Sequence, residues 1–579
     1  MESTRRHPPR TRDPRRPGAA LAAALALAAC SAARPSGRPP ATAAPGAPGE
    51  AAVNAAEAKG VVAWLADPAR TGRGVGTPGN AAAAAYLAER MRAIGLEPGG
   101  DGGFLQPFDA PVGAKLAGEN LLVLAGRPAP VGSAWQPFTF SDNGEARGEL
   151  VWAGHGITAP ALGYDDYAGL DVKGKIVVVA AHFPREADQA SPFRDPKAYG
   201  FGEWRYKAMN ARDHGAAALV AVRDDWNHPG DDALPPWRGQ VASRAGIVAV
   251  RATLAALAGA GVDARRLAAA GQEDGKPHSR ALGAEARVVA HVEQERAQTA
   301  NVVGVLRGTD PAAGCVVVGA HYDHLGFGGE TSLSPERHEV HPGADDNASG
   351  VAALLEIARG AAAGARPRRS IVFAAFSGEE LGLLGSSRFV KEPPAACPLA
   401  ATQLMVNLDM VGRPQAGKLY VEGADTAKGG RDLVRASAAL PPRIPLTLAF
   451  GGDGYGPSDH TSFYAKGVPV VFFFTGAHAD YHRPSDTADK IDGAGLAEVA
   501  RLAFRIVREA ADGAPLVAVR GAAAPPQPRG ERDRGYGAYL GSIPDFEERS
   551  EPGVLVAAVR PGSPAEKAGM KGGDVITRV

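Results

Sequence analysis

Apolar residues along the chain form two kinds of pattern. Continuous apolar runs occupy positions 315–320, 371–376 and 468–474. Short runs of this kind, bounded by polar and turn-forming residues, indicate buried strands. Residues 81–95 and 351–358 instead place apolar side chains every three or four positions, which predicts amphipathic helices. Strands that alternate with helices predict an α/β fold with a mixed central sheet flanked by helices.

A histidine and an aspartate follow the first of these strands. His321 and Asp323 lie two positions apart, so an extended backbone puts both side chains on one side. Imidazoles that bind metals usually give their second N–H to a carboxylate. We therefore expect His321 to be a metal ligand and Asp323 to be the group that orients it.

Carboxylates and a second histidine follow the other predicted strands and one loop. Catalytic groups in α/β proteins favour the carboxyl ends of strands, so these side chains are expected to converge on one place. They are Asp346 in the loop 343–350, Glu379 and Glu380 after the run 371–376, Asp409 after residues 406–408, and His482 after the run 468–474.

The charges of these groups favour two divalent ions over one. Asp346, Glu380 and Asp409 bring three negative charges and a hydroxide a fourth, which equals the charge of two zinc ions. Without metal the carboxylates would repel one another, and several would take up protons. A carboxylate that bridges two metals roughly 3.5–4 Å apart lets both bind one water and lowers the pKa of that water. Glu379 is then left over as a base.

The five motifs, in this order across residues 321–482, resemble the co-catalytic zinc peptidases of the bacterial leucyl aminopeptidase and glutamate carboxypeptidase type. The resemblance implies a phosphorylase/hydrolase-like α/β fold and two zinc ions per chain. Asp346 would bridge the metals. Glu380 and His482 would complete one site, and His321 and Asp409 the other.

The resemblance also implies roles for residues around the metals. Glu379 is expected to be the general base. Tyr481 is expected either to stabilise the tetrahedral oxyanion or to be a packed aromatic. The Asp346–Asn347 bond lies where the family carries a cis non-proline peptide. Asp459 and His460 resemble a motif that lines the cleft, and either orient the substrate, support the last ligand or have a structural role.

Three further histidines border the loop before the bridging aspartate. They do not belong to the five motifs, so no ligand role carries over to them from the family. We expect them at the surface or as supporting groups rather than as extra ligands. They are His324, His338 and His341.

The charge balance excludes two classes of partner. Lys and Arg number 63, as do Asp and Glu, and residues 1–29 hold six Arg, one Asp and one Glu, so the remainder carries 57 minus 61, or −4. A chain with this balance has no charge excess that would attract nucleic acid or an anionic membrane surface. Peptide substrates are the expected partners.

The amino terminus predicts export. Arginines precede an apolar stretch at 19–27, which is shorter than the roughly 20 residues that span a bilayer, so residues 1–30 are expected to be a signal peptide. Residues 27–30 resemble the lipobox of bacterial lipoproteins, in which Cys30 would be acylated. The protein is then expected to be lipid-anchored in the cell envelope through Cys30, or secreted, with residues 31–50 as a flexible tether.

The remaining sequence divides into a catalytic part and two additions. We assign residues 51–137 and 292–515 to the catalytic domain. Residues 138–291 resemble a protease-associated (PA) domain, which in relatives lies beside the active site. After a linker at 516–532, residues 533–579 resemble the first half of a PDZ domain.

Two cysteines lie beyond the predicted lipidation site, at positions 315 and 397. Cys315 falls in an apolar strand, where a cysteine behaves as a small buried hydrophobe. Export permits a disulfide, but two cysteines in a chain of this size do not argue for one.

Three functions are compatible with these motifs. The first is a two-zinc exopeptidase, specifically an aminopeptidase, and the presence of both His321 and Asp409 beside Asp346 favours it. The second is a glutaminyl cyclase, which shares the scaffold but uses a single zinc. The third is a peptide-binding lipoprotein without activity, against which the intact Glu379 argues.

Overall fold

The computed structural model describes residues 49–194, 201–223, 232–234, 237, 244–328, 331–334, 337–440, 442, 444–452, 454–519, 542–544, 554–559, 563–572 and 574–576. The predicted signal peptide, the acylated Cys30 and the tether up to residue 48 lie outside the described residues. Within the described ranges, no helix has the length and apolar character needed to cross a bilayer.

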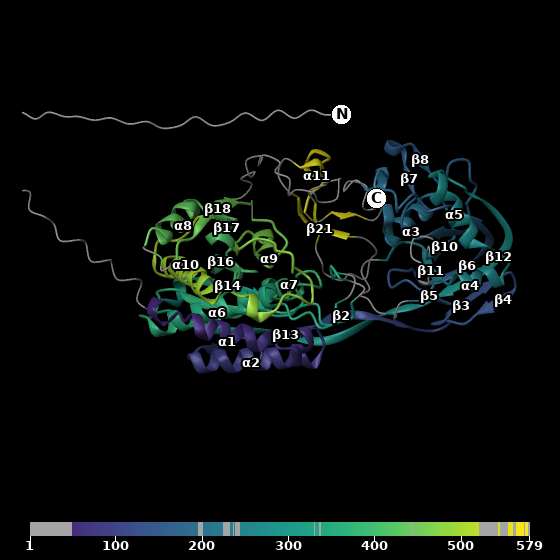
Figure 1. Cartoon of the computed structure of the whole chain (residues 1–579). Coiled ribbons are helices and arrows are strands. Elements are labelled where there is room, and N and C mark those ends of the chain that lie inside the picture. The colour runs from purple at the N-terminus through teal and green to yellow at the C-terminus, as the bar shows by residue number, and fades with distance from the viewer. Residues whose placement is uncertain are drawn as a thin grey trace, which may run out of the picture. The chain divides into compact units, whose positions relative to one another are not determined.

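The catalytic part is built on a sheet of nine strands with parallel strands at its centre (Figure 1). The central strands β15 (Ser370–Phe376), β14 (Cys315–His321), β16 (Thr402–Leu408) and β19 (Val470–Phe474) are parallel to one another. The strands around them make the sheet mixed, because β13 and β17 pair antiparallel with β15 and β19. These outer strands are β1 (Glu97–Pro98), β2 (Leu105–Leu116), β13 (Val292–Leu306), β17 (Lys418–Glu422) and β18 (Thr447–Gly451).

Helices cover both faces of this sheet, because alternate strand residues are apolar on both sides. Val316 and Val318 of β14 pack into one core with α1 (Ala55–Leu65), α2 (Pro78–Ile94), α6 (Gly350–Ala363), α8 (Gly430–Ala438) and α10 (Gly493–Asp512). Val317 faces the other core, with α7 (Leu384–Lys391) and α9 (His460–Ala465). The predicted α/β class with a mixed, helix-flanked sheet is therefore confirmed.

A disulfide joins Cys315 to Cys397, with the two Cα atoms 5.5 Å apart. The expectation that Cys315 is only a buried hydrophobe is therefore corrected. The two cysteines are 82 positions apart, and the fold brings them together because the start of β14 and the loop before β16 share one apolar core. The sequence pattern around each cysteine contains nothing that identifies the other.

The insert forms a second sheet of eight strands with its own apolar cores. Its strands, in spatial order, are β4 (Arg127–Ala129), β3 (Leu121–Leu124), β12 (Arg280–Ala290), β6 (Gly144–Trp152), β9 (Ile176–Ala180), β10 (Ala218–Val222), β11 (Val248–Ala252) and β5 (Trp135–Pro137). Its helices are α3 (Trp204–Asp213), α4 (Leu254–Gly259) and α5 (Ala264–Asp274), and β7 (Thr158–Ala159) pairs with β8 (Tyr164–Asp165).

The insert sheet begins earlier than the sequence predicts. Residues 121–137 were expected in the catalytic part, but β3 pairs with β12 and β5 with β11. The physical reason is that these short strands gain hydrogen bonds from partners far along the chain, which local sequence does not reveal. By sheet membership the insert runs from β3 to β12.

The tail contains a small sheet of β20 (Ser542–Pro544), β21 (Val554–Val559) and β22 (Val575–Ile576), with the short helix α11 (Pro564–Lys567). Most of the predicted linker, residues 520–532, lies outside the described residues. The partial PDZ domain at 533–579 stays a prediction.

Candidate metal centre

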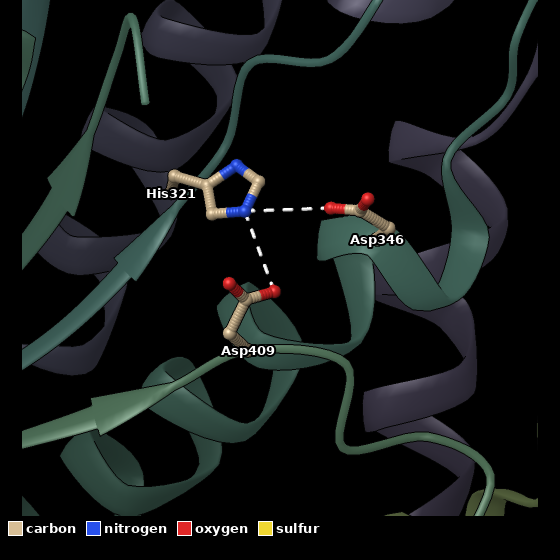
Figure 2. Close-up of side chains that lie close together, drawn as sticks. All are labelled: His321, Asp346 and Asp409. Carbon is tan, nitrogen blue, oxygen red and sulfur yellow. Dashed lines mark ion pairs between the residues drawn. The ribbon is translucent and has the colours of Figure 1, made fainter. Parts of the chain in front are cut away.

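Two groups of potential metal ligands share one carboxylate. His321, Asp346 and Asp409 form the first group, and His324, Asp346 and Glu380 the second; within each group the ligand atoms lie within 4.8 Å of one another. Figure 2 shows the first group, in which one ring nitrogen of His321 faces both carboxylates. Asp346, which belongs to both groups, therefore has the position of a bridge.

The central strands explain how these residues meet. His321 is the last residue of β14, Glu380 follows β15, Asp409 follows β16, and His482 lies beyond β19. Because the four strands are parallel, their carboxyl ends reach the same edge of the sheet. The structure thus brings together the five side chains that the sequence proposes as metal ligands.

Each oxygen of the Asp346 carboxylate faces a different imidazole. The Oδ1 atom lies 3.4 Å from Nε2 of His321, and Oδ2 lies 3.2 Å from Nε2 of His482. The same nitrogens also lie near a second carboxylate, at 3.4 Å from Oδ1 of Asp409 and 3.2 Å from Oε2 of Glu380. The arrangement defines two half-sites of one imidazole and one carboxylate, with Asp346 between them.

The loop that carries Asp346 is fixed by hydrogen bonds to the segment around Asp409. The amide of Asn347 donates to the carbonyl of Leu408 at 2.9 Å, and its Oδ1 accepts from N of Met410 at 3.2 Å. The hydroxyl of Ser349 accepts from N of Val411 at 3.0 Å. The peptide bond between Asp346 and Asn347 is cis, as the resemblance implies.

Backbone carbonyls orient both histidines. Nδ1 of His482 lies 2.8 Å from the carbonyl of Thr331, and Nδ1 of His321 lies 3.2 Å from the carbonyl of Asp323. The carboxylate of Asp323 is farther from that ring, at 3.8 Å, and its Oδ1 instead accepts from N of Glu379 at 3.2 Å. Asp323 thus contacts both the ligand strand and the predicted base. Its burial raises the pKa of the carboxyl to about 6.

Glu379 borders the first half-site. Its Oε2 lies 3.9 Å from Nε2 of His321, too far for a hydrogen bond but close enough for both atoms to contact one small molecule beside them. Burial, together with the neighbouring carboxylates of Glu380 and Asp409, raises the pKa of Glu379 well above its usual value, against the opposing effect of His321. A carboxyl with a raised pKa that faces a ligand cluster has the properties of a general base.

The remaining ligands show how strongly the cluster favours positive charge. Burial alone would raise the pKa of Glu380, but hydrogen bonds from His324 and His482 lower it well below its usual value. Burial would lower the pKa of His482, but Asp346 and Glu380 raise it to about 11. The pKa of His321 is raised in the same way, because Asp409, Glu379 and Asp346 outweigh burial.

His324 lies inside the site, although the sequence left its place open between the surface and a supporting role. The side chain is fully buried, and Nδ1 lies 2.7 Å from Oε1 of Glu380. Oε2 of the same carboxylate faces His482, so His324 supports Glu380 from the opposite side. His341 is also buried and hydrogen-bonded, at 2.8 Å from the hydroxyl of Ser332, whereas His338 is exposed.

Arg73 is a buried cation that the sequence motifs do not single out. Its guanidinium donates to the carbonyls of Tyr322, Pro342 and Gly343 at 2.6–2.9 Å. It therefore joins the segment after β14 to the start of the Asp346 loop. Burial lowers the pKa of Arg73 to about 10, against the raising effect of the nearby carboxylates. The only local signal is its place in the turn-rich stretch 72–79.

Tyr481 and the pair Asp459 and His460 lie close to the ligands. The Tyr481 ring stacks on His482 with centroids 3.9 Å apart, and burial raises the pKa of its hydroxyl. The His460 ring stacks on Phe472 at 4.4 Å, and burial lowers its pKa to about 3. Burial raises the pKa of Asp459 to about 7. These contacts are compatible with either a functional or a structural role.

Comparisons with known proteins find similar peptidases. Residues 301–507 match the peptidase family M28, and residues 146–258 match the PA domain. Aminopeptidase YwaD of Bacillus subtilis is 27% identical over 384 residues, which cover 63% of this chain and 70% of that protein. The probable lipoprotein aminopeptidase LpqL of Mycobacterium tuberculosis is 28% identical over 218 residues, 32% of this chain and 41% of that protein.

Solved structures show the same fold. An aminopeptidase from Aneurinibacillus sp. strain AM-1 is 26% identical, with a TM-score of 0.51 over 81% of this chain and 97% of that chain. The zinc aminopeptidase BSAP from Bacillus subtilis is 24% identical, with a TM-score of 0.51 over 80% and 96%. The predicted family and the predicted PA domain are confirmed. The chain is therefore a peptide hydrolase whose residues 301–507 match peptidase family M28, with a PA domain inserted into its catalytic part.

Proposed function

We propose that the protein is an exported zinc aminopeptidase, which removes amino-terminal residues from peptides at a site for two zinc ions. The observation that carries this proposal is the position of Asp346, whose two carboxylate oxygens lie 3.4 and 3.2 Å from the imidazoles of His321 and His482. One carboxylate between two separate ligand pairs is the arrangement that a two-metal hydrolase requires.

The donor set suits zinc. Each half-site offers one imidazole nitrogen and one carboxylate oxygen besides the shared Asp346, and zinc binds both kinds of donor. Three ligand carboxylates in a buried cluster also need positive charge to remain ionised together. When bound, zinc would lower the pKa of a water at this site and polarise a peptide carbonyl.

The chain's own residues supply the proton transfers. We assign Glu379 as the general base that accepts a proton from the attacking water and donates it to the leaving amine. Its Oε2 is 3.9 Å from Nε2 of His321, on the border of the site where that water would lie. Tyr481, beside His482, is proposed to stabilise the oxyanion of the tetrahedral intermediate. Asp459 and His460 are proposed to line the substrate cleft.

Zinc analysis combined with mass spectrometry of a peptide pool tests this proposal. Purified full-length protein should bind two zinc ions, lose activity on chelation, and shorten peptides from the amino end, with large apolar first residues removed fastest. A single zinc in fully active protein would favour a glutaminyl cyclase instead. Release of carboxyl-terminal residues, or cleavage within peptides, would refute the aminopeptidase assignment.

Export is supported by two observations besides the predicted signal peptide. The Cys315–Cys397 disulfide suits an oxidising compartment. A relative is described as a probable lipoprotein aminopeptidase. We propose acylation at Cys30, which mass spectrometry of the mature amino terminus would test. A mature protein that starts beyond residue 30, or a Cys30→Ser variant that fractionates with membranes as wild type does, would contradict it.

A further inference from the structure

The segment after His482 contacts the loop that carries Asp346 through one buried carboxylate, that of Asp486. Oδ2 of Asp486 accepts hydrogen bonds from N of Asp345 at 2.9 Å and from N of Asp346 at 3.1 Å. The backbone carbonyl of Asp486 accepts from N of Ala344 at 3.1 Å. Three successive amides of the Asp346 loop are therefore held by a residue four positions after another ligand.

The other carboxylate oxygen of Asp486 connects to the third ligand segment. Arg413, four positions after Asp409, donates from Nη2 to Oδ1 of Asp486 at 2.5 Å. Its Nη1 lies 2.8 Å from Oδ2 of Asp480, which precedes His482 by two residues. The guanidinium thus holds both ends of the His482 segment.

Asp345 adds further contacts between the same three segments. Its Oδ1 accepts from N of Gly412 at 2.7 Å, and its Oδ2 lies 3.1 Å from Nε2 of His478. Asp345 and Asp486 are fully buried, and Arg413 is largely buried. The segments that carry Asp346, Asp409 and His482 are therefore linked through side chains that do not bind metal themselves.

A carboxylate at position 486 is an unexpected choice on electrostatic grounds. It adds negative charge beside a cluster that already holds several carboxylates, and it is removed from solvent, which costs free energy. Its contacts compensate for this cost, because one oxygen takes two backbone amides and the other a guanidinium. An asparagine offers one acceptor oxygen, and its NH₂ group would face either the amides or the guanidinium, which are donors.

We propose that Asp486, held by Arg413, is the positioning residue that fixes the bridging carboxylate of Asp346 and thereby sets the affinity for both metal ions. This inference rests on the proposed two-metal site. Because Asp346 serves both half-sites, a loss of its position weakens both metals, whereas loss of a terminal ligand such as His482 weakens one.

Asp486→Asn in the full-length protein tests the inference, with Asp480→Asn as the matched control. Both substitutions remove one negative charge from Arg413, but Asp480 is partly exposed and its carboxylate bonds to Arg413 and Lys490. Zinc dissociation constants are measured by competition with a chelator. Asp486→Asn should raise both constants about 10–100-fold, as is typical for groups that orient metal ligands. Asp480→Asn should change them less than about fivefold, as for a partly exposed ion pair.

Two further measurements separate positioning from general stability. The melting temperature of the metal-free protein records the general loss of stability, which should be larger for the buried Asp486→Asn, while the absorption bands of the cobalt-substituted protein should change in Asp486→Asn alone. Equal zinc constants in the two variants, or weakening of one metal only, would overturn the inference. If Asp486→Asn does not fold, Arg413→Lys replaces it, because lysine keeps the charge but cannot hold two carboxylates in a fixed fork. It should also weaken both metals, and unchanged constants would overturn the inference.

Failure of the proposed function gives a different result. Wild-type protein that binds a single zinc would refute the two-metal site. The ratio of the Asp486→Asn and Asp480→Asn constants for that one ion would still test whether Asp486 positions Asp346.

Discussion

The PA domain and the metal centre both bury ionisable groups, but they satisfy them in opposite ways. In the PA domain the buried ammonium of Lys207 donates to the carbonyls of His155, Ala180 and His182. The carboxylate of Asp166 accepts from two backbone amides at 2.9 and 3.0 Å and from the hydroxyl of Tyr164 at 2.8 Å. These charged groups are matched mainly to the backbone around them.

In the metal centre, charged side chains face one another instead. Nε2 of His321 lies within 3.9 Å of the carboxylates of Asp346, Glu379 and Asp409. Nε2 of His324 is buried and has no hydrogen-bond partner among the described residues. A cluster of this kind needs cations from outside the chain, whereas the PA cluster is complete. Burial of charge alone therefore does not identify a functional site, and the nature of the partners does.

Glu379→Gln gives the largest expected effect and tests whether the catalytic cluster does chemistry. The amide keeps the size of the side chain but cannot accept the proton, so kcat should fall about 10²–10⁴-fold, towards the upper end of the range for general bases. Zinc content and KM should stay close to wild type. Retention of more than about a tenth of the rate, or loss of a zinc, would mean that Glu379 is not the base.

Glu380→Ala is the matched control for the neighbouring glutamate. Oε2 of Glu380 lies 3.2 Å from Nε2 of His482, so this carboxylate belongs to a half-site. The variant should lose zinc as well as rate. Full zinc occupancy in Glu380→Ala would indicate that the two glutamates have exchanged roles.

Zinc removal should destabilise one domain and spare the other. A ligand that binds only the native state, at a thousand times its dissociation constant, stabilises that state by about 4 kcal/mol. Hydrogen exchange read by mass spectrometry should therefore show faster opening in peptides from β14 and β16 after chelation. Peptides from β9 and β10 of the PA domain serve as the internal control. Equal loss of protection in both sheets would show that zinc stabilises the two domains alike.

Lys207→Met tests the buried hydrogen-bond cluster around Lys207 in the PA domain. The substitution keeps a long apolar stem but leaves three buried carbonyls without their donor, at about 1–3 kcal/mol for each unsatisfied group. Protection in β9 and β10 should fall by about 3 kcal/mol, while zinc content and kcat remain at the wild-type level. A matching loss of zinc would show that the Lys207 cluster is not independent of the metal centre.

The sequence predicts the parts of the site that lie at strand ends. His321 and Glu380 each follow an apolar run, Asp409 follows residues 406–408, and the parallel order of these strands is enough to bring the three together. His324 could not be placed, because one histidine in a turn can point either way. Asp486 could not be found either, since its role depends on amides 140 and 141 positions away.

The same limit applies to the fold. The central strands β14, β15 and β19 are predicted because each lies in a continuous apolar run, which any sequence window reveals. The strands β3 and β5 are short and pair with β12 and β11, far along the chain. The Cys315–Cys397 disulfide likewise depends on an apolar core that only the folded chain defines. Contacts set by long-range packing are therefore the ones that local pattern misses.

His155 gives the smallest expected effect and tests the PA cluster by pH. Burial lowers the pKa of this imidazole to about 3, with a further lowering by Lys207. A group whose pKa is depressed on folding stabilises the native state above its unfolded value, near 6.5, and this stability is lost as the pH falls below it. At pH 5, about 1.5 units below that value, the loss is about 2 kcal/mol relative to pH 7 or above.

Burial raises the pKa of Asp166 to about 7, so its contribution to stability changes with pH in the opposite direction. Wild type must therefore be compared with a His155→Gln variant. Protection of β9 and β10 at pH 7 and pH 5 in the two proteins isolates the histidine. Wild type should lose about 2 kcal/mol more than the variant over this interval. Equal pH dependence in both proteins would show that His155 takes up its proton in the folded domain. The buried cluster of the PA domain would then accept a further positive charge.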